Sequence, residues 1–169
     1  MNRRTILSLS AITTLGFVLP PSNAVGQQKS LKDQLVGTWT VVSSTTKLPD
    51  GNLAWGSNPK GLYIFTDNGR YSSHLLRSDR PKFASNNRAT GTPEENKAAV
   101  LGNSSNFGSY SVNEANKTFT IRFEGSSYPN LEGVEQTRPF MISGDELIVT
   151  NPAPTVGRSP SQLVLKRAK

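Results

Sequence analysis

The sequence predicts an all-β fold: an eight-stranded up-and-down antiparallel barrel with one short helix. Eight short segments alternate apolar or β-branched residues with polar ones, which is typical of strands with one buried face. Short turns join most of these segments, and this favours successive hairpins over parallel βαβ units. Because a meander of this length is most stable when it closes on itself, we expect a barrel.

The first residues are typical of an export signal. A short basic start, "MNRR", precedes an apolar stretch too short to indicate a membrane span, and Ser22 and Ala24 are the small residues that a signal peptidase reads. We predict a signal peptide over residues 1–24 with cleavage after Ala24, a flexible segment over 25–34 and the barrel domain over 35–168. The mature form is then periplasmic or extracellular, without a membrane span. An uncleaved anchor is the alternative, and "NRRTIL" leaves open whether export is Sec or twin-arginine.

The predicted strands are residues 37–45, 61–66, 70–77, 107–113, 117–126, 134–142, 146–151 and 161–167. Asn68 and Gly69 form a tight turn between the second and third strands, because both residues tolerate a positive φ. "EANK" and "SGD" separate two further pairs of strands. Each of these pairs is therefore predicted to form a hairpin.

The stretch "TPEENKAAVLGN" predicts the helix. Thr92 can cap it, with Pro93 at the first helical position and Glu95 at the third, and Gly102 is a suitable terminator. The helix follows a long polar loop over residues 77–91. We expect this insertion either to gate a binding site or to plug or cap one end of the barrel.

Trp39 stands near the start of the first strand, an unusual place for so large a core residue. In a closed barrel its indole can plug the narrow end, and Gly37 lets the backbone turn beneath it. A basic residue of the closing strand, Arg167 or Lys166, can lie over the ring in a cation–π contact. We interpret Gly37, Trp39 and Arg167 as scaffold.

Composition excludes several kinds of chemistry. The chain has no cysteine, which excludes disulfides, thiolate metal ligands and a cysteine nucleophile. It has one histidine, so a zinc site is not expected, and it contains neither a phosphate-binding loop nor a dinucleotide fingerprint. We expect no metal and no cofactor. The net charge of +7 is spread along the chain without a basic run, which argues against nucleic-acid binding.

The end of the barrel opposite Trp39 is the expected binding site. We expect an elongated cavity that opens there, near the loop over 77–91. The candidate ligand-contacting residues are Tyr63, Phe65, His74, Tyr110, Arg122 and Phe140. The aromatic residues would contact the body of a ligand, and Arg122 or His74 would fix its polar end.

Arg122 and His74 each have an alternative role. If Phe119 and Phe123 face inward, Arg122 lies on a solvated outer face, which is the favoured interpretation. If they face outward, Arg122 is a buried cation suited to a carboxylate. For His74, a structural or surface role is favoured, because no nucleophile motif surrounds it.

Several stretches resemble one protein family in the order in which they occur. "GTW" is similar to the Gly-x-Trp signature of the lipocalins, and "NPKGLYIFTDNGRYSSHLLRSDRPKFAS", "GTPEE", "FGSYSV" and "EGSSYPNLEGVEQTRPF" resemble the bacterial and fungal lipocalin-like domain family. The resemblance covers essentially the whole mature chain and implies an eight-stranded barrel with a central cavity. The second and third short motifs of the animal lipocalins are missing, so a function such as retinoid carriage is not implied.

Three classes of function fit these observations. The first is an exported barrel that binds a small, mainly hydrophobic or amphipathic ligand. The second is a cofactor-free cyclase or isomerase, because some lipocalin-like relatives act in natural-product pathways. The third is a protein-interaction module such as a protease inhibitor. Two convergent titratable side chains in the cavity would favour the enzyme. A single polar anchor in an apolar cavity would favour a carrier, and a filled core without a cavity would favour the interaction module. The sequence decides neither the ligand nor the oligomeric state.

Overall fold

The computed structural model of the protein describes residues 29–158 and 160–169, and the predicted signal peptide with its cleavage site lies outside the described residues. In chain order the elements are α1 (Leu31–Leu35), β1 (Gly37–Ser44), β2 (Lys60–Phe65), β3 (Arg70–Leu76), η1 (Arg88–Thr90), α2 (Pro93–Leu101), β4 (Asn103–Asn113), β5 (Thr118–Ser126), η2 (Pro129–Leu131), β6 (Glu135–Ser143), β7 (Glu146–Asn151) and β8 (Ser161–Arg167). The largest difference from the predicted strands is in β4, which begins at Asn103, directly after α2.

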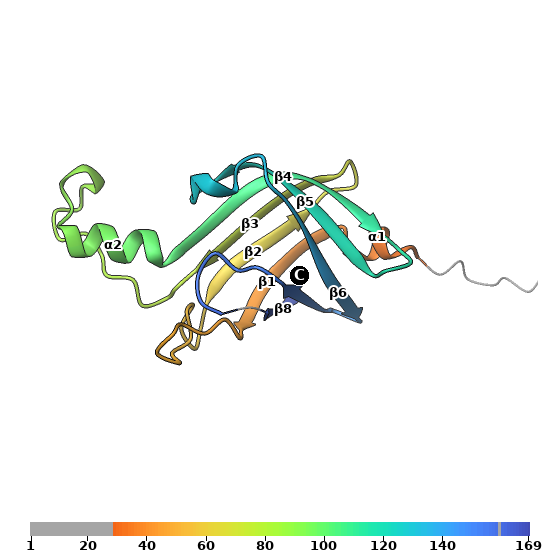
Figure 1. The fold of residues 1–169 in the computed structure, drawn as a ribbon, viewed down its shortest axis with the longest axis horizontal. Helices are drawn as coiled ribbons and strands as arrows, with labels where there is room; N and C mark the ends of the chain where they lie inside the picture. Colours follow the sequence, from red (N-terminus) through yellow and green to blue (C-terminus); the bar gives the residue numbers. More distant parts are fainter. Residues whose placement is uncertain (1–28, 159) are drawn as a thin grey trace, which may run out of the picture.

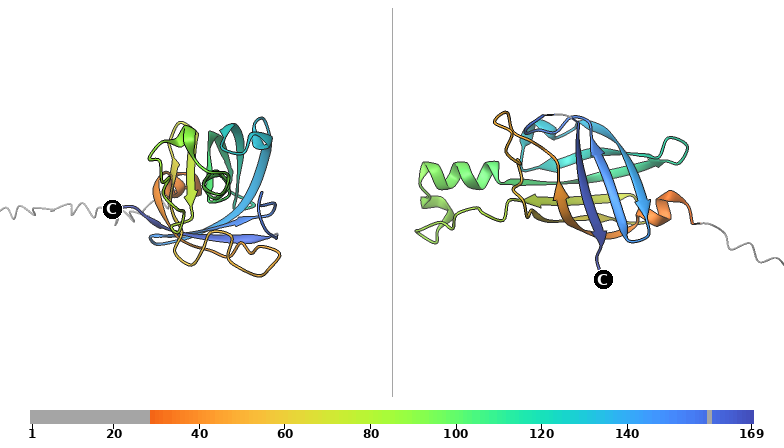
Figure 2. Two further views of the ribbon diagram at one scale, coloured as in Figure 1. Left: turned by 90° about the vertical axis from the view of Figure 1, so that its left-hand side faces the viewer. Right: turned by 90° about the horizontal axis from the view of Figure 1, so that it is seen from below.

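The eight strands form one closed barrel in which each strand pairs with its neighbours in sequence. β1 completes the ring by pairing antiparallel with β8, where Trp39 faces Arg167 and Val41 faces Leu165. Figures 1 and 2 show the barrel from three directions. The predicted fold class is confirmed.

Aromatic side chains fill the barrel interior towards the Trp39 end. The ring of Phe65 lies 5.1–5.3 Å, centroid to centroid, from those of Tyr71, Tyr110 and Phe119. These four side chains are all buried. Because each ring removes a large apolar area from water and edge-to-face pairs are favourable, this cluster is a main stabilising part of the core.

The helix α1 closes the Trp39 end of the barrel. Trp39 is fully buried, and its indole Nε1 donates a hydrogen bond to the carbonyl oxygen of Leu35 at 2.8 Å. Leu35 is the last residue of α1 and is itself fully buried. Residues 31–34, predicted to be flexible, therefore belong to a short helix that is held against the barrel by this apolar anchor.

The other expected scaffold residues lie at the same end. Gly37 begins β1 with a φ of 131°, a conformation that favours glycine. A Cβ atom at this position would lie 2.9 Å from Nη1 of Arg167. The glycine therefore leaves room for the guanidinium across the end of the barrel.

The helix α2 and the loop before it project from the barrel at the end opposite α1 (Figures 1 and 2). Thr92 and Glu95 form the predicted capping box, in which each side chain accepts from the other's backbone N–H. None of the residues of α2 is buried, so this helix does not plug the barrel. Within residues 29–158 and 160–169, no helix has the length and apolar character needed to cross a membrane.

Candidate ligand-binding site

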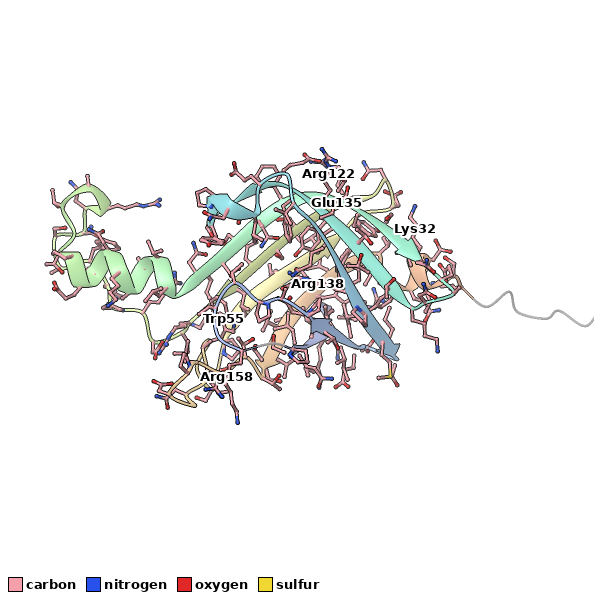
Figure 3. All side chains as sticks on the ribbon, in the orientation of Figure 1. Lys32, Trp55, Arg122, Glu135, Arg138 and Arg158 are labelled. Atoms are coloured by element: carbon pink, nitrogen blue, oxygen red, sulfur yellow. The ribbon has the colours of Figure 1, made fainter. Side chains whose placement is uncertain are left out.

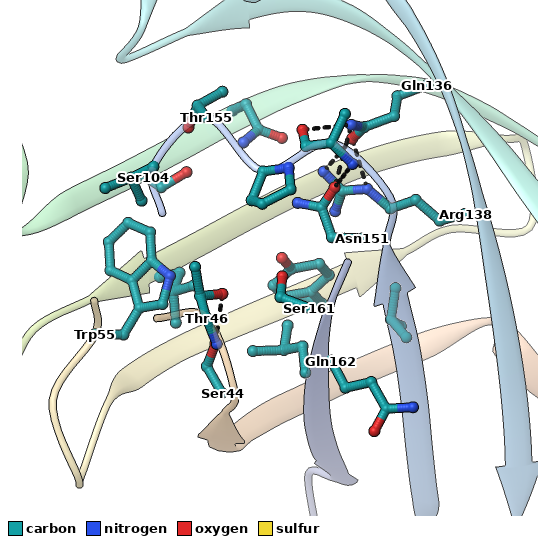
Figure 4. A pocket seen from close by; sticks show the side chains of 18 of the residues that line it. Ser44, Thr46, Trp55, Ser104, Gln136, Arg138, Asn151, Thr155, Ser161 and Gln162 are labelled. Carbon is teal, nitrogen blue, oxygen red and sulfur yellow. Dashed lines mark hydrogen bonds between the residues drawn. The ribbon is translucent and has the colours of Figure 1, made fainter. Parts of the chain in front are cut away.

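A cavity lies inside the barrel at the end opposite Trp39 (Figure 4). Its free volume is about 50 Å³, which is room for a few water molecules. Strand residues that line it include Ser44, Tyr63, Leu75, Asn106, Arg138, Val149, Asn151 and Leu163. Residues 153–156, in the loop between β7 and β8, and Trp55, in the connection between β1 and β2, also line it.

Arg138 carries the positive charge of this cavity. On β6 its buried side chain alternates with the exposed residues Thr137 and Pro139, so it points into the barrel, and it is only 7% exposed. Its Nε and Nη2 both donate to Oε1 of Gln136, at 2.8 and 2.6 Å. Among the described residues, no carboxylate oxygen lies within the 4.0 Å of this guanidinium that an ion pair requires. Its direct protein acceptor is therefore a neutral amide.

Gln136 links Arg138 to the loop that covers the cavity. Its Nε2 donates to Oδ1 of Asn151 at 3.1 Å and to the carbonyl oxygen of Ala153 at 2.9 Å. The same Asn151 oxygen accepts from the backbone N–H of Ala153 at 3.1 Å. Figure 4 shows the side chains of Gln136, Arg138 and Asn151 close together. The network therefore holds the start of the β7–β8 loop over Arg138.

A second hydrogen-bonded chain runs from β3 to Asn106, which lines the cavity. The hydroxyl of Tyr71 donates to Oγ of Ser73 at 2.6 Å, and this Oγ donates to Oδ1 of Asn106 at 3.0 Å. Burial raises the pKa of Tyr71 far above its usual value, because a phenolate would lose its hydration there. Tyr71 therefore stays neutral and is no counter-ion for Arg138.

Among the predicted ligand-contacting residues, only Tyr63 lines this cavity. Phe65, Tyr110 and Phe140 are buried in the aromatic core nearer Trp39. The hydroxyl of Tyr110 is already used, since it donates to a backbone carbonyl at 2.7 Å. These three side chains therefore support the fold and do not form the wall of this cavity.

His74 and Arg122 lie on the outer face of the barrel, away from the cavity. The side chain of Arg122 is 63% exposed and lies 3.5 Å from Glu135 (Figure 3). The ring nitrogens of His74 are in hydrogen-bond range of the hydroxyls of Ser72 and Ser105, at 3.3 and 3.1 Å. Arg122 points outward because the alternate residues of β5 are the buried ones. Neither side chain can fix a ligand inside this cavity.

The long loop over residues 77–91 does not form the mouth of the cavity. It leaves the barrel together with α2 (Figure 2), and none of its residues lines the cavity. Since α2 buries none of its residues, no apolar contact draws this insertion over the opening. The shorter β7–β8 loop covers the cavity instead.

Arg138, Gln136 and Trp55 are not among the residues predicted from the sequence. The sequence contains a signal for Arg138 and Gln136, because they lie two and four residues before Phe140 and alternate residues share one face of a strand. An inward Phe140 therefore places Arg138 and Gln136 inside as well. Trp55 carries no such signal, because it lies in a loop and its burial comes from packing over the open end.

The side chains that line the cavity are better suited to binding a ligand than to transferring protons. Its ionisable side chains are Arg138 and Tyr63, and the described lining contains neither a carboxylate nor an imidazole, the most common general bases. In the part of the chain that the structure describes, no group of three or more histidine, aspartate or glutamate side chains is placed to hold a metal ion.

Comparison with known families agrees with the architecture. The sequence profile of the family described as lipocalin-like domain matches residues 36–167, a range that contains all eight strands and α2. No curated protein sequence matches the chain. The match extends over most of the chain, and the closed eight-stranded barrel is the fold that it implies. The chain belongs to the lipocalin-like domain family.

Proposed function

We propose that the protein is an exported binding protein that takes a small amphipathic molecule at the open end of its barrel. The observation that carries the proposal is the cavity itself, which keeps a buried, charged side chain in a barrel whose core is mainly apolar. A concave, mainly enclosed site with a few placed polar groups is typical of small-molecule pockets.

The occupant has to displace the covering loop. The free volume of about 50 Å³ is small beside the several hundred Å³ of common ligand pockets, roughly 300–1,000 Å³. Residues 153–156 form part of the lining, and the hydrogen bond from Gln136 to Ala153 holds their start. Outward movement of this loop would enlarge the cavity without breaking the ladder of the barrel.

Binding is favoured over catalysis and over a purely structural interaction module. A cyclase or isomerase that works by acid–base chemistry needs a group that accepts a proton, and a guanidinium does not serve as one. An interaction module would favour a barrel packed solid, whereas here the open end retains a cavity with a polar lining. One cationic anchor beside apolar residues supports a carrier.

Two measurements test the proposed function. Native mass spectrometry of protein purified from its own host should detect a retained small molecule. Titration with fatty acids, aromatic acids and polyketide-like acids should change the tryptophan fluorescence through Trp55, which lines the cavity. The change should disappear in Trp55→Phe, because Trp39 is buried at the other end. A protein that retains nothing and responds to no member of the panel is not a small-molecule carrier.

Export rests on the first residues of the sequence. The basic start, the apolar stretch and the small residues Ser22 and Ala24 support cleavage after Ala24. N-terminal sequencing of protein from the periplasm or medium should begin at Val25. Recovery of the intact chain from the cytosol would contradict export and leave ligand binding unaffected.

A further inference from the structure

The feature that calls for an explanation is the unbalanced charge of Arg138. As a residue, Arg138 is only 7% exposed, and it lines the cavity. Its Nε and Nη2 share a single amide oxygen, Oε1 of Gln136, and its Nη1 donates to no described residue. The ion pairs of the described residues all lie elsewhere, on the outer surface and in the loop before α2.

A buried cation without a counter-ion is costly to the fold. Removal of a charged group from water is compensated only when an opposite charge or several good acceptors replace the lost hydration. At Arg138 one neutral oxygen serves two donors. The hydroxyl of Tyr71 donates a hydrogen bond to Ser73 and stays neutral, so it provides no negative charge for Arg138. The protein thus holds a positive charge that its own described residues leave uncompensated.

Three other arginines of the barrel have more hydrogen-bond acceptors or a carboxylate nearby. Arg70 forms two hydrogen bonds with Glu124, at 2.6 and 2.7 Å, and Arg122 lies near Glu135 at 3.5 Å. Arg167 is part-buried and has two backbone carbonyl partners, at 3.0 and 2.6 Å. Arg138 alone among these four combines deep burial with a single acceptor and a position on the wall of a cavity.

We propose that the molecule bound at the open end is a carboxylate, with its two oxygens on the guanidinium of Arg138 and its apolar body against the side chains that line the cavity. A guanidinium presents paired N–H donors whose spacing matches a carboxylate. Leu75, Val149 and Leu163 are among the apolar residues of the lining. Nη1 and the cavity-facing edge of the guanidinium are the donors that remain for the ligand.

Gln136 gives this anchor a connection to the covering loop. Its oxygen accepts from Arg138 while its nitrogen donates to the carbonyl of Ala153. A carboxylate bound to Nη1 and Nη2 would share Nη2 with Gln136. The same contact therefore places the ligand's charged end directly beneath the start of the loop.

The inference rests on the proposed function, and its test separates the two. Decanoate and naphthalene-2-carboxylate, each beside its methyl ester, are titrated into the protein at neutral pH by calorimetry. The acid and the ester have nearly the same apolar body and differ in charge. We expect at least one acid to bind wild-type protein about tenfold or more tightly than its ester, the size of a charge-assisted hydrogen bond.

The matched variants are Arg138→Gln and Arg122→Gln, which remove one positive charge from the inner and the outer face of neighbouring strands. Arg138→Gln should reduce acid binding to the level of the ester, and Arg122→Gln should leave both affinities unchanged. If Arg138→Gln does not fold, Arg138→Lys and the acid-to-ester ratio of wild type decide the question.

The outcomes are distinct. Equal binding of acid and ester by wild type overturns the carboxylate inference and leaves the proposed binding function intact. Equal loss in Arg138→Gln and Arg122→Gln overturns it as well, because a general electrostatic effect then explains the preference. If neither acid nor ester binds, both the inference and the binding function fail for these ligand classes.

Discussion

Arg167 lies over the indole of Trp39, with its guanidinium carbon 4.1 Å from the centroid of the ring. The same guanidinium donates hydrogen bonds to the backbone carbonyls of Val36 and Gln34, at 3.0 and 2.6 Å. A single side chain of β8 therefore contacts the aromatic plug of β1 and the C-terminal end of α1. This contact joins three elements at the closed end of the barrel.

Loss of this contact should be measurable as stability. We expect Arg167→Gln to lower the free energy of unfolding by about 2 kcal/mol, from one cation–π contact and two hydrogen bonds to a charged group. Urea denaturation monitored by circular dichroism measures the change. Lys166→Gln is the matched control, because Lys166 is the neighbouring basic residue and is exposed. Equal effects of the two substitutions would contradict a specific role for Arg167.

Removal of the plug itself should cost more. Trp39→Ala is expected to lower the free energy of unfolding by about 3–5 kcal/mol, since it deletes a fully buried aromatic side chain. Met141→Ala, at an exposed position of β6, should change it by less than about 0.5 kcal/mol. A loss below about 1 kcal/mol for Trp39→Ala would mean that the barrel end does not depend on the indole.

A substitution at Phe65 tests whether the aromatic core and the binding site are independent. Phe65→Ala should also lower the free energy of unfolding by about 3–5 kcal/mol, because its ring contacts three other buried rings. The affinity ratio between an acid and its ester should stay unchanged, since Phe65 does not line the cavity. A changed ratio in a variant that is still folded would show that the ligand reaches the aromatic core.

The cap of α2 should be sensitive to acid. The carboxylate of Glu95 accepts from the backbone N–H groups of Ala84 and Thr92, and these hydrogen bonds lower its pKa below the ordinary value. Such a group stabilises the folded state above its unfolded pKa and loses this contribution as the pH falls through the folded pKa. We therefore expect the cap to open only on acidification below the usual range of glutamate.

An NMR titration checks this behaviour. The Glu95 carboxyl should titrate at lower pH in the folded protein than in urea, and the amide signals of Ala84 and Thr92 should shift with the same midpoint. Glu95→Gln should remove that common midpoint. If the folded and unfolded midpoints coincide, the two hydrogen bonds do not persist in solution.

The projecting loop should be dispensable for binding. Replacement of residues 82–91 by a short glycine–serine linker should leave ligand affinity unchanged, because this loop does not line the cavity. A substitution in the β7–β8 loop, Ala153→Gly, is the comparison, because it loosens the backbone that Gln136 holds. Altered release rates should follow the second change and not the first. The reverse result would restore the long loop as the gate.

The fold could be predicted from sequence because its local signals agree. Alternation defines the strands, turn residues define the hairpins, and Thr92, Pro93 and Glu95 define the capping box. The helix before β1 was not predicted, because the five residues of α1 make a helix too short to be stable without contacts to the rest of the protein. The indole of Trp39 donates to the backbone carbonyl of Leu35, a contact between β1 and α1 that no local pattern indicates.

The site was harder to predict because it depends on which face of each strand points inward. For β5 the buried phenylalanines turn Arg122 outward, and for β6 the buried Phe140 turns Arg138 inward. The covering loop depends on long-range packing, which no local pattern encodes. If Phe140 is assigned to the inner face, the alternation of the strand places Arg138 on the same face. This assignment alone would have made Arg138, and not Arg122, the candidate cation.

The pairing of β1 with β8 also determines the order in which the chain can fold. Most strand pairs are hairpins of neighbours in sequence, whereas Trp39 and Arg167 meet across nearly the full length of the domain. Closure of so long a loop costs more chain entropy than closure of a hairpin, and such contacts slow folding. Hairpins can therefore form while the chain is still emerging from a ribosome. Arg167 can join the indole and the end of α1 only after the eighth strand has emerged.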